Sequence, residues 1–340
     1  MAPEWPAGAY SQERYFREHP AGLFFPAALL ARLGYPASQA AFAVNLLYQA
    51  LTLVFLARLA GALVGEREAR ALAWVLQLLP LAFAYRVRAN HEQPLVMFLA
   101  AALLGLEHAR RDPRWSLLTV AGLLGLLLVK GVLAAPAFLV CLAWVALRPR
   151  GRWPWLALAL SAAAAIAAVA AYEAAYRAVT GESFLATYLG RQILTGHVRN
   201  PLDRLGGYAY AFVWYFARVV WFAFPWSLVA LAALPRLVTG GAAVARGGWI
   251  ALATTAVYLL LFSASERRAE RYLFPAYYAV AMAGALAAAG RFPRFARLVG
   301  KVDGLGPWAA PALFVLLFAL HLAGGWLHLP RIKVWAPDGG

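Results

Sequence analysis

Residues 154–177 read PWLALALSAAAAIAAVAAYEAAYR, an apolar run whose charged side chains lie only near its end. A helix needs about 20 residues to cross the hydrocarbon core of a bilayer, and this run is long enough. Outward from it in both directions, charged or Pro- and Gly-rich breaks separate about ten apolar stretches of this kind. They are residues 40–64, 69–86, 93–108, 115–129, 132–147, 154–177, 209–233, 247–264, 272–290 and 307–328.

The composition points to lipid as the solvent. Of 340 residues, 63% are hydrophobic and 14% are charged, which leaves too little polar surface for a water-facing shell. The sequence therefore predicts an all-α polytopic transmembrane helical bundle. The Ala-rich run at 162–171 is expected to pack closely against neighbouring helices, because small residues permit close approach in lipid. The single cysteine, Cys141, lies inside an apolar stretch, so no disulfide framework is predicted.

We predict that residues 1–340 form a single membrane domain. We expect an outer loop over residues 1–36, the transmembrane bundle over 37–328 and an outer tail over 329–340. Within the loop, residues 21–33 are rich in Leu and Phe but too short to span a bilayer. Such a segment is typical of a helix that lies in the plane of the membrane interface.

The distribution of charge between loops predicts the orientation. Counting crossings from the N-terminus places short, arginine-rich loops on one side, and the positive-inside rule assigns that side to the cytoplasm. The opposite side receives most of the carboxylates and a comparable number of arginines, so the shortness of the loops decides the assignment. The expected cytoplasmic loops are residues 65–68, 108–114, 148–152, 235–246 and 291–301.

The formal net charge of +16 raises the possibility of a nucleic-acid partner. The arginines are scattered over many short loops, and no basic stripe with stacking aromatics is present. We therefore predict no nucleic-acid partner and assign the positive charge to contacts with anionic membrane lipids.

Ionisable residues gather where membrane segments meet the outer side, and such groups are costly at membrane depth unless they line a site. They are RYFREHP at 14–20, RVRANHEQP at 86–94, Lys130 within LLLVKGVL, and SERRAERYLFP at 265–275. Each has an ordinary alternative: an interfacial cap, a solvated turn, a lysine that snorkels to the interface, or an exposed ion-pair network. All of them fall on the same predicted face, which independent snorkelling residues need not do.

At these positions the chain resembles the GT-C membrane glycosyltransferases, specifically family 39. That family contains the dolichyl-phosphate-mannose protein mannosyltransferases and the lipid A aminoarabinose transferase. Each element of the resemblance is loose alone, but five in the expected order are more specific. They are REHPAGL at 17–23, RANHEQPL at 88–95, VKG at 129–131, FPWS at 224–227 and RYLFPAY at 271–277.

The resemblance implies a GT-C-like fold and transfer of a sugar, with inversion, from a polyprenyl-phosphate donor to a lipid, glycan or protein acceptor. Glu18, His19 and Glu92 are then the candidate catalytic residues, with acid, base or orienting roles. Arg88, Lys130 and Arg271 are the candidate donor-phosphate clamp. No soluble cofactor is required, no metal site is assigned, and a divalent metal is not excluded.

The sequence departs from the family at its start, where the family places one more helix and an acidic residue regarded as the catalytic base. We expect that the reading is truncated. The alternatives are that Glu4, Glu13 or Glu18 substitutes for that residue, or that the chain is inactive.

Two non-enzymatic functions stay open: a polyprenyl-lipid transporter or flippase, and a non-catalytic subunit of an envelope-glycan assembly. A transporter would favour an inverted repeat with paired broken helices, and none is evident. The Ala-, Leu- and Arg-rich composition indicates a bacterial inner membrane, with the site facing the periplasm or exterior.

Overall fold

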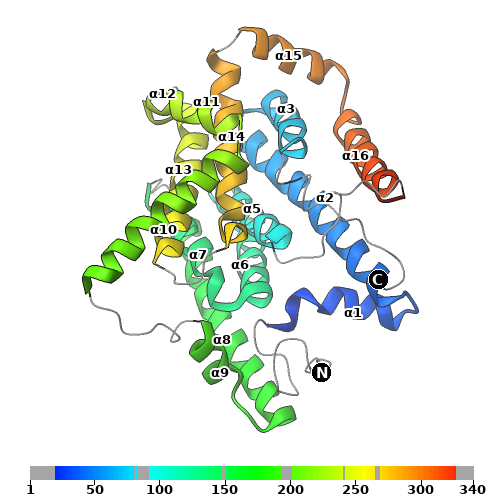
Figure 1. Cartoon of the computed structure of the whole chain (residues 1–340), viewed down its shortest axis with the longest axis vertical. Helices are drawn as coiled ribbons and strands as arrows, with labels where there is room; N and C mark the ends of the chain where they lie inside the picture. The colour runs from blue at the N-terminus through cyan, green and yellow to red at the C-terminus, as the bar shows by residue number, and fades with distance from the viewer. Residues whose placement is uncertain are drawn as a thin grey trace.

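The structure is a computed structural model that describes residues 20–79, 82, 92–147, 151–192, 201–239, 242–264, 269–291 and 293–326. Within these ranges the regular elements are all helical (Figure 1). The α-helices are α1 (Phe25–Arg32), α2 (Ala37–Val64), α3 (Glu66–Gln77), α5 (Glu92–Ala109), α6 (Ser116–Lys130), α7 (Ala135–Leu147), α8 (Trp153–Thr180), α9 (Phe184–Gln192), α10 (Pro201–Phe222), α11 (Trp226–Ala232), α12 (Leu234–Thr239), α13 (Ala242–Ser263), α14 (Phe274–Arg291), α15 (Pro293–Gly304) and α16 (Ala309–Trp326). Short 3-10 turns are η1 (Ala21–Leu23), η2 (Pro113–Trp115), η3 (Gly131–Ala134) and η4 (Glu270–Leu273).

The prediction of an all-α polytopic protein is confirmed, although the spans are less regular than expected. Among the described residues, three helices are long and apolar enough to cross a membrane: Gln39–Val64, Pro113–Lys130 and Trp153–Thr180. Two bent helix pairs raise this number to at most five, if each pair is one span. Other expected stretches contain helices that are shorter, such as Ala135–Leu147 and Gly247–Ser263.

One bent pair corrects the expected continuous span at 209–233. The helices Leu205–Phe222 and Trp226–Ala232 meet at an angle of 111°. Pro225 lies in the break between them, and a proline cannot donate the backbone hydrogen bond that would continue a helix. The second pair, Arg294–Gly304 and Ala309–Leu320, meets at 91°, with Gly306 in the connecting turn at φ +80°.

Helices α2, α3, α5, α6, α13 and α14 pack together and supply much of the largest buried apolar cluster. Glycines bring α5 and α6 into close contact. A Cβ on Gly105 would lie 2.5 Å from Thr119 Oγ1, and one on Gly122 would lie 2.7 Å from the Phe98 carbonyl oxygen. Because packing drives helix association in lipid, these contacts define the hairpin that carries part of the site.

The Ala-rich run at 162–171 does not pack as expected. It lies in α8, where only 11% of the apolar window is buried inside the molecule. Helix α8 contacts its neighbours mainly through Pro154, Ala157 and Ser161 near its start and Tyr176 near its end. Alanine is as compatible with lipid as with a helix contact, so its abundance did not identify the packed face.

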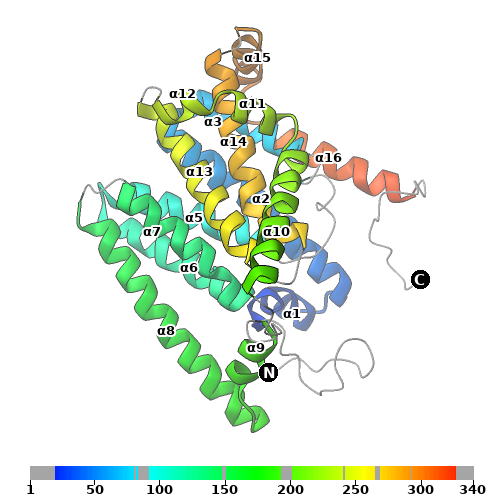
Figure 2. The same cartoon turned by 60° about the vertical axis from the view of Figure 1, so that its left-hand side comes forward.

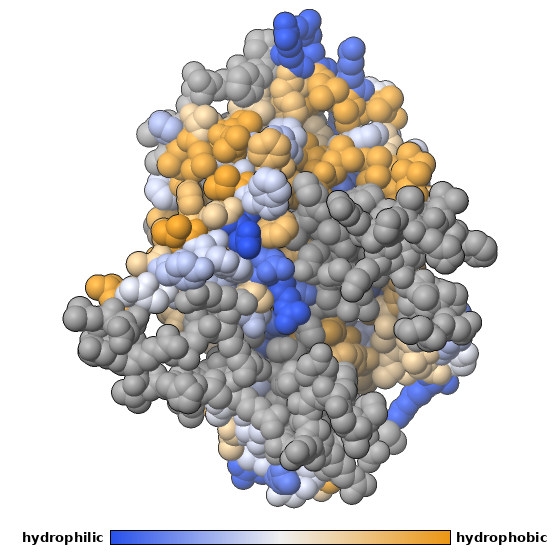
Figure 3. Space-filling model, viewed as in Figure 1, coloured by the Kyte–Doolittle hydropathy of each residue, from blue (hydrophilic) through white to orange (hydrophobic). Residues whose placement is uncertain are grey.

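The two ends of the bundle carry different helices. Helix α14 begins directly after η4 and ends next to α15, so η4 and α15 lie at opposite ends of α14. Figure 1 shows α15 at the top of the molecule and α1, α8 and α9 at the bottom. Figure 3 shows hydrophilic residues over α15 and a band of hydrophobic residues below it. The helix expected at 21–33 is present as η1 and α1, which contact α6 and α2 (Figure 2).

Candidate active site

Three of the predicted site residues come together at one end of the bundle. Glu92 is the first residue of α5 and Lys130 is the last residue of α6. Because α5 and α6 pack as an antiparallel hairpin, these two positions lie at the same end. Arg271, in η4 ahead of α14, joins them there.

A single carboxylate oxygen faces both cations. Glu92 Oε1 lies 3.8 Å from Lys130 Nζ and 3.8 Å from Arg271 Nε. Both separations exceed the 2.7–3.2 Å range of N–H···O hydrogen bonds, so these contacts are ion pairs without a short direct hydrogen bond. Among the described residues of the site, one anion therefore lies between two cations.

Burial divides the three side chains into two kinds. Glu92 is 2% exposed and Lys130 is 3% exposed, whereas the Arg271 side chain is 56% exposed. A buried charge is costly without a partner of opposite sign, which gives the Glu92–Lys130 pair its physical reason. The helix dipoles also stabilise these two charges, because the carboxylate lies at the N-terminus of α5 and the ammonium at the C-terminus of α6.

The backbone at Lys130 is anchored by an aromatic residue from another helix. Tyr188, in α9, donates a hydrogen bond of 2.9 Å from its hydroxyl to the Lys130 carbonyl oxygen. Gly131 follows at φ +62°, where a Cβ would lie 2.5 Å from that hydroxyl. Tyr188 is buried and stacks on Phe184 with a centroid separation of 5.3 Å. The turn after α6 thus has a defined path that fits glycine alone.

Residues next to Arg271 and Glu92 in the sequence also form hydrogen bonds with tyrosines. The Tyr277 hydroxyl donates to the Glu270 carbonyl oxygen at 2.6 Å, and the Ala269 backbone N–H donates to the Tyr215 hydroxyl at 3.3 Å. These bonds tie η4 to α14 and α10. Beside Glu92, Gln93 donates from Nε2 to the Tyr278 hydroxyl at 3.4 Å.

Sequence reasoning did not identify these supporting residues. Tyr188 lies in a segment with no charge cluster or motif, and its only signal is the neighbouring aromatic content. Gln93 and Tyr277 lie in the stretches 86–94 and 271–277, where the charged residues carry the prediction of a site. The Tyr188–Lys130 and Gln93–Tyr278 contacts join residues far apart in the chain, which a local pattern cannot reveal.

The remaining predicted site residues, Glu18, His19 and Arg88, lie outside the described residues. Their roles stay predictions, as do those of Glu92, Lys130 and Arg271. Among the residues that the structure describes, no group of three His, Cys, Asp or Glu side chains is placed to hold a metal ion.

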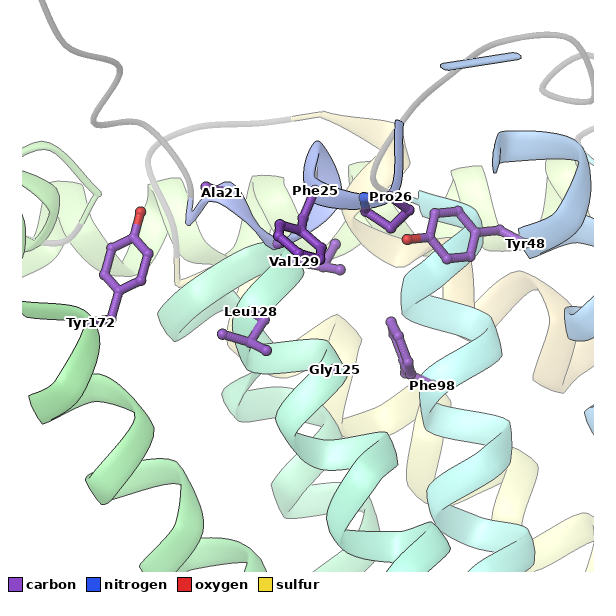
Figure 4. A pocket seen from close by; sticks show the side chains of 10 residues that line it. Ala21, Phe25, Pro26, Tyr48, Phe98, Gly125, Leu128, Val129 and Tyr172 are labelled. Atoms are coloured by element: carbon purple, nitrogen blue, oxygen red, sulfur yellow. The ribbon is translucent and has the colours of Figure 1, made fainter. Parts of the chain in front are cut away.

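An apolar cavity of about 360 Å³ adjoins the end of α6 (Figure 4). It lies between η1 and α1 on one side and α2, α5, α6 and α8 on the other. Its lining includes Ala21, Phe25, Phe98, Leu128, Val129 and Tyr172. Val129, the residue before Lys130, is part of this lining, whereas Lys130 itself is not.

The fold and this site describe a class of protein: an all-α polytopic membrane protein with a buried carboxylate between two cations at one end of its bundle. Residues 18–172 match the family model described as dolichyl-phosphate-mannose-protein mannosyltransferase. The predicted resemblance to the GT-C glycosyltransferases is confirmed over this range, which contains Glu92 and Lys130. The match supports a membrane glycosyltransferase of the GT-C type. No curated protein and no solved structure matches the chain significantly.

Proposed function

We propose that the chain transfers a sugar from a polyprenyl-phosphate donor to a hydroxyl of a lipid, glycan or protein acceptor, with inversion at the sugar carbon. The observation that carries the proposal is the placement of Glu92 between Lys130 and Arg271 at one end of a membrane bundle. The family match over residues 18–172 supports the class of reaction.

The chemistry requires that the bond between the sugar carbon and the phosphate oxygen breaks while a bond to the acceptor oxygen forms. The departing polyprenyl phosphate carries negative charge, and cations placed beforehand stabilise such charge most effectively in a dry site. Arg271 is the better placed to contact the phosphate, because its side chain is more than half exposed. Lys130 adds a second positive charge from a buried position.

The acceptor proton must pass to a base, which can contribute about 10² to 10⁴ in rate. Glu92 is 2% exposed and faces two cations, an arrangement that suits orienting those cations better than contacting an acceptor hydroxyl. We therefore assign Glu92 the positioning role and retain Glu18 as the candidate base, with His19 as its helper and Arg88 as a further phosphate contact.

The proposed setting is a bacterial inner membrane with the site facing the periplasm or exterior. The donor then reaches the site from the outer leaflet, and membrane lipids surround the bundle. The short, arginine-rich loops on the side assigned to the cytoplasm support this orientation.

The experiment is transfer of labelled sugar in reconstituted vesicles, with polyprenyl phosphates that carry different sugars. Arg271→Gln should lower turnover by about 10² to 10³, the loss that follows removal of one group stabilising transition-state charge. Arg177→Gln is the matched control, because Arg177 is equally exposed and also pairs with a glutamate, Glu173. Full turnover in Arg271→Gln would overturn the clamp, and flipping of donor without sugar release by the wild type would favour a transporter.

A further inference from the structure

Helix α15 lies across the end of the bundle that is opposite the charged site, where it joins α14 to α16 (Figure 1). The helices Arg294–Gly304 and Ala309–Leu320 meet at 91°. On α16, the side chains of Val315, Leu316 and Leu320 are more than half exposed, and large apolar side chains exposed in this way indicate contact with lipid. Because α16 then runs across the bilayer, α15 lies close to the membrane plane.

Two contacts with α3 fix this bend. Arg70 on α3 forms an ion pair with Asp303 on α15. Further along α3, Gln77 donates a hydrogen bond of 3.2 Å from Nε2 to the Ala310 carbonyl oxygen at the start of α16. The apolar side of α15, which includes the buried Val299, faces α3 and α14. The opposite side of α15 is therefore turned away from the bundle.

The outward side of α15 is basic. Arg294, Arg297 and Lys301 recur at helical spacing and are all exposed, and we call these three residues the basic face of α15. The helix has one carboxylate, Asp303, which pairs with Arg70. A helix of twelve residues with these charges is too short and too polar to enter the hydrocarbon core.

Apolar side chains beside the basic face place it at the depth of the lipid headgroups. Leu298 lies among the three cations and is 52% exposed. Leu305 and Trp308, in the turn that follows α15, are 62% and 79% exposed. Such side chains, and tryptophan in particular, favour the boundary between headgroups and acyl chains. The neighbouring cations are therefore within reach of lipid phosphates.

We propose that the basic face of α15 binds the phosphates of anionic phospholipids and that this contact holds the helix flat against one leaflet. The positive-inside rule assigns this end of the bundle to the cytoplasm, and anionic lipids of a cytoplasmic leaflet attract basic helices. The lipid contact lies at the end opposite Glu92 and Lys130. It goes beyond the proposed function and requires no sugar transfer.

The first experiment measures lipid binding by the purified full chain in an uncharged detergent. Phosphatidylglycerol or phosphatidylcholine is added, and the rise in unfolding temperature gives an apparent Kd for each lipid. One cation near an anionic surface is worth about fivefold in affinity, so Arg294→Gln/Arg297→Gln/Lys301→Gln should weaken phosphatidylglycerol binding by about 10- to 100-fold. Phosphatidylcholine binding should not change. The unfolding temperature without lipid should also stay the same, because all three side chains are exposed.

The matched control removes three other exposed cations from the side assigned to the cytoplasm. Arg111→Gln/Arg114→Gln/Arg152→Gln lowers the net charge by the same amount, but these residues do not share one face of a helix. This control should weaken phosphatidylglycerol binding by less than about threefold. Equal losses in the two triple variants would make the effect one of net charge and overturn the assignment, as would unchanged binding in the α15 variant.

A second experiment tests the orientation of α15 in vesicles that contain phosphatidylglycerol. On a Cys141→Ala background, a nitroxide is attached at Arg294→Cys or at Lys301→Cys, and its depth is measured from collisions with oxygen and with a polar nickel complex. A helix in the membrane plane keeps the two nitroxides within about 3 Å in depth, whereas a helix along the bilayer normal separates them by about 10 Å. A separation near the larger value, or two nitroxides in bulk water, would overturn the proposal.

Discussion

Replacement of Glu92 by glutamine should destabilise the protein through Lys130. The variant keeps the shape of the side chain but leaves an ammonium that is 3% exposed without its carboxylate. At a separation of 3.8 Å and an effective dielectric constant of about 20, two unit charges attract by roughly 4 kcal/mol. Arg271 lies at the same distance but is more than half exposed, so solvent limits its share to about 1 kcal/mol or less.

The expected loss in the free energy of unfolding for Glu92→Gln is therefore about 3–5 kcal/mol, the range for breaking a buried ion pair from one side. Lys130→Met should cost less, because Glu92 keeps Arg271 as a partner. The double variant Glu92→Gln/Lys130→Met removes both buried charges, so it should be more stable than Glu92→Gln alone. Denaturant titration in detergent micelles measures all three variants against the wild type.

The double-mutant cycle tests the reasoning directly. Residues in one ion pair should show an interaction free energy of about 0.5–3 kcal/mol. If the two single losses add to within about 0.5 kcal/mol, the Glu92–Lys130 pair does not hold this end of the bundle together. Arg177→Gln is the exposed control and should cost less than about 1 kcal/mol, since the Arg177 side chain is 61% exposed.

Three further predictions concern the helices around the site. Tyr188→Phe removes the hydroxyl that donates to the Lys130 carbonyl oxygen, so the free energy of unfolding should fall by about 1 kcal/mol. The KM for the donor should rise several-fold, and an unchanged KM would show that this bond does not position the lysine. Gly131→Ala should lower the thermal stability more than Gly181→Ala. Both glycines have positive φ, but only a Cβ at Gly131 would lie against another residue, 2.5 Å from the Tyr188 hydroxyl. Equal losses would show that backbone strain is the whole effect. Gly122→Val should cost about 1–3 kcal/mol by overpacking the α5–α6 contact, and a neutral result in the same assay would mean that the hairpin adjusts freely.

Much of the fold follows from runs of hydrophobic residues. The starts of α5 and α14 and the end of α6 coincide with charged or Pro-containing breaks, so the positions of Glu92, Lys130 and Arg271 at helix ends could be predicted. Their placement at one end of the bundle also follows from counting crossings. Antiparallel neighbours return the chain to the same side, and the α5–α6 hairpin does so with a short turn.

The bends and the packed faces could not be predicted in the same way. Pro225 lies inside a continuous apolar stretch, and hydropathy alone does not report that the helix stops there. The Ala-rich part of α8 reads as a packing surface but lies largely exposed. In lipid both a packed face and a lipid-facing one are apolar, so the pattern of polar and apolar residues that distinguishes them in water is missing.

The sequence by itself determined the solvent, the helical class and the presence of charged residues at membrane depth, because each follows from composition and local order. Only the tertiary structure decided that one Glu92 oxygen faces both cations, that Tyr188 anchors the turn after Lys130, and that an apolar cavity lies between α1 and α6. These contacts join α1, α5, α6, α9 and η4, elements separated along the chain. Their distances depend on how side chains pack in three dimensions, and no local pattern encodes them.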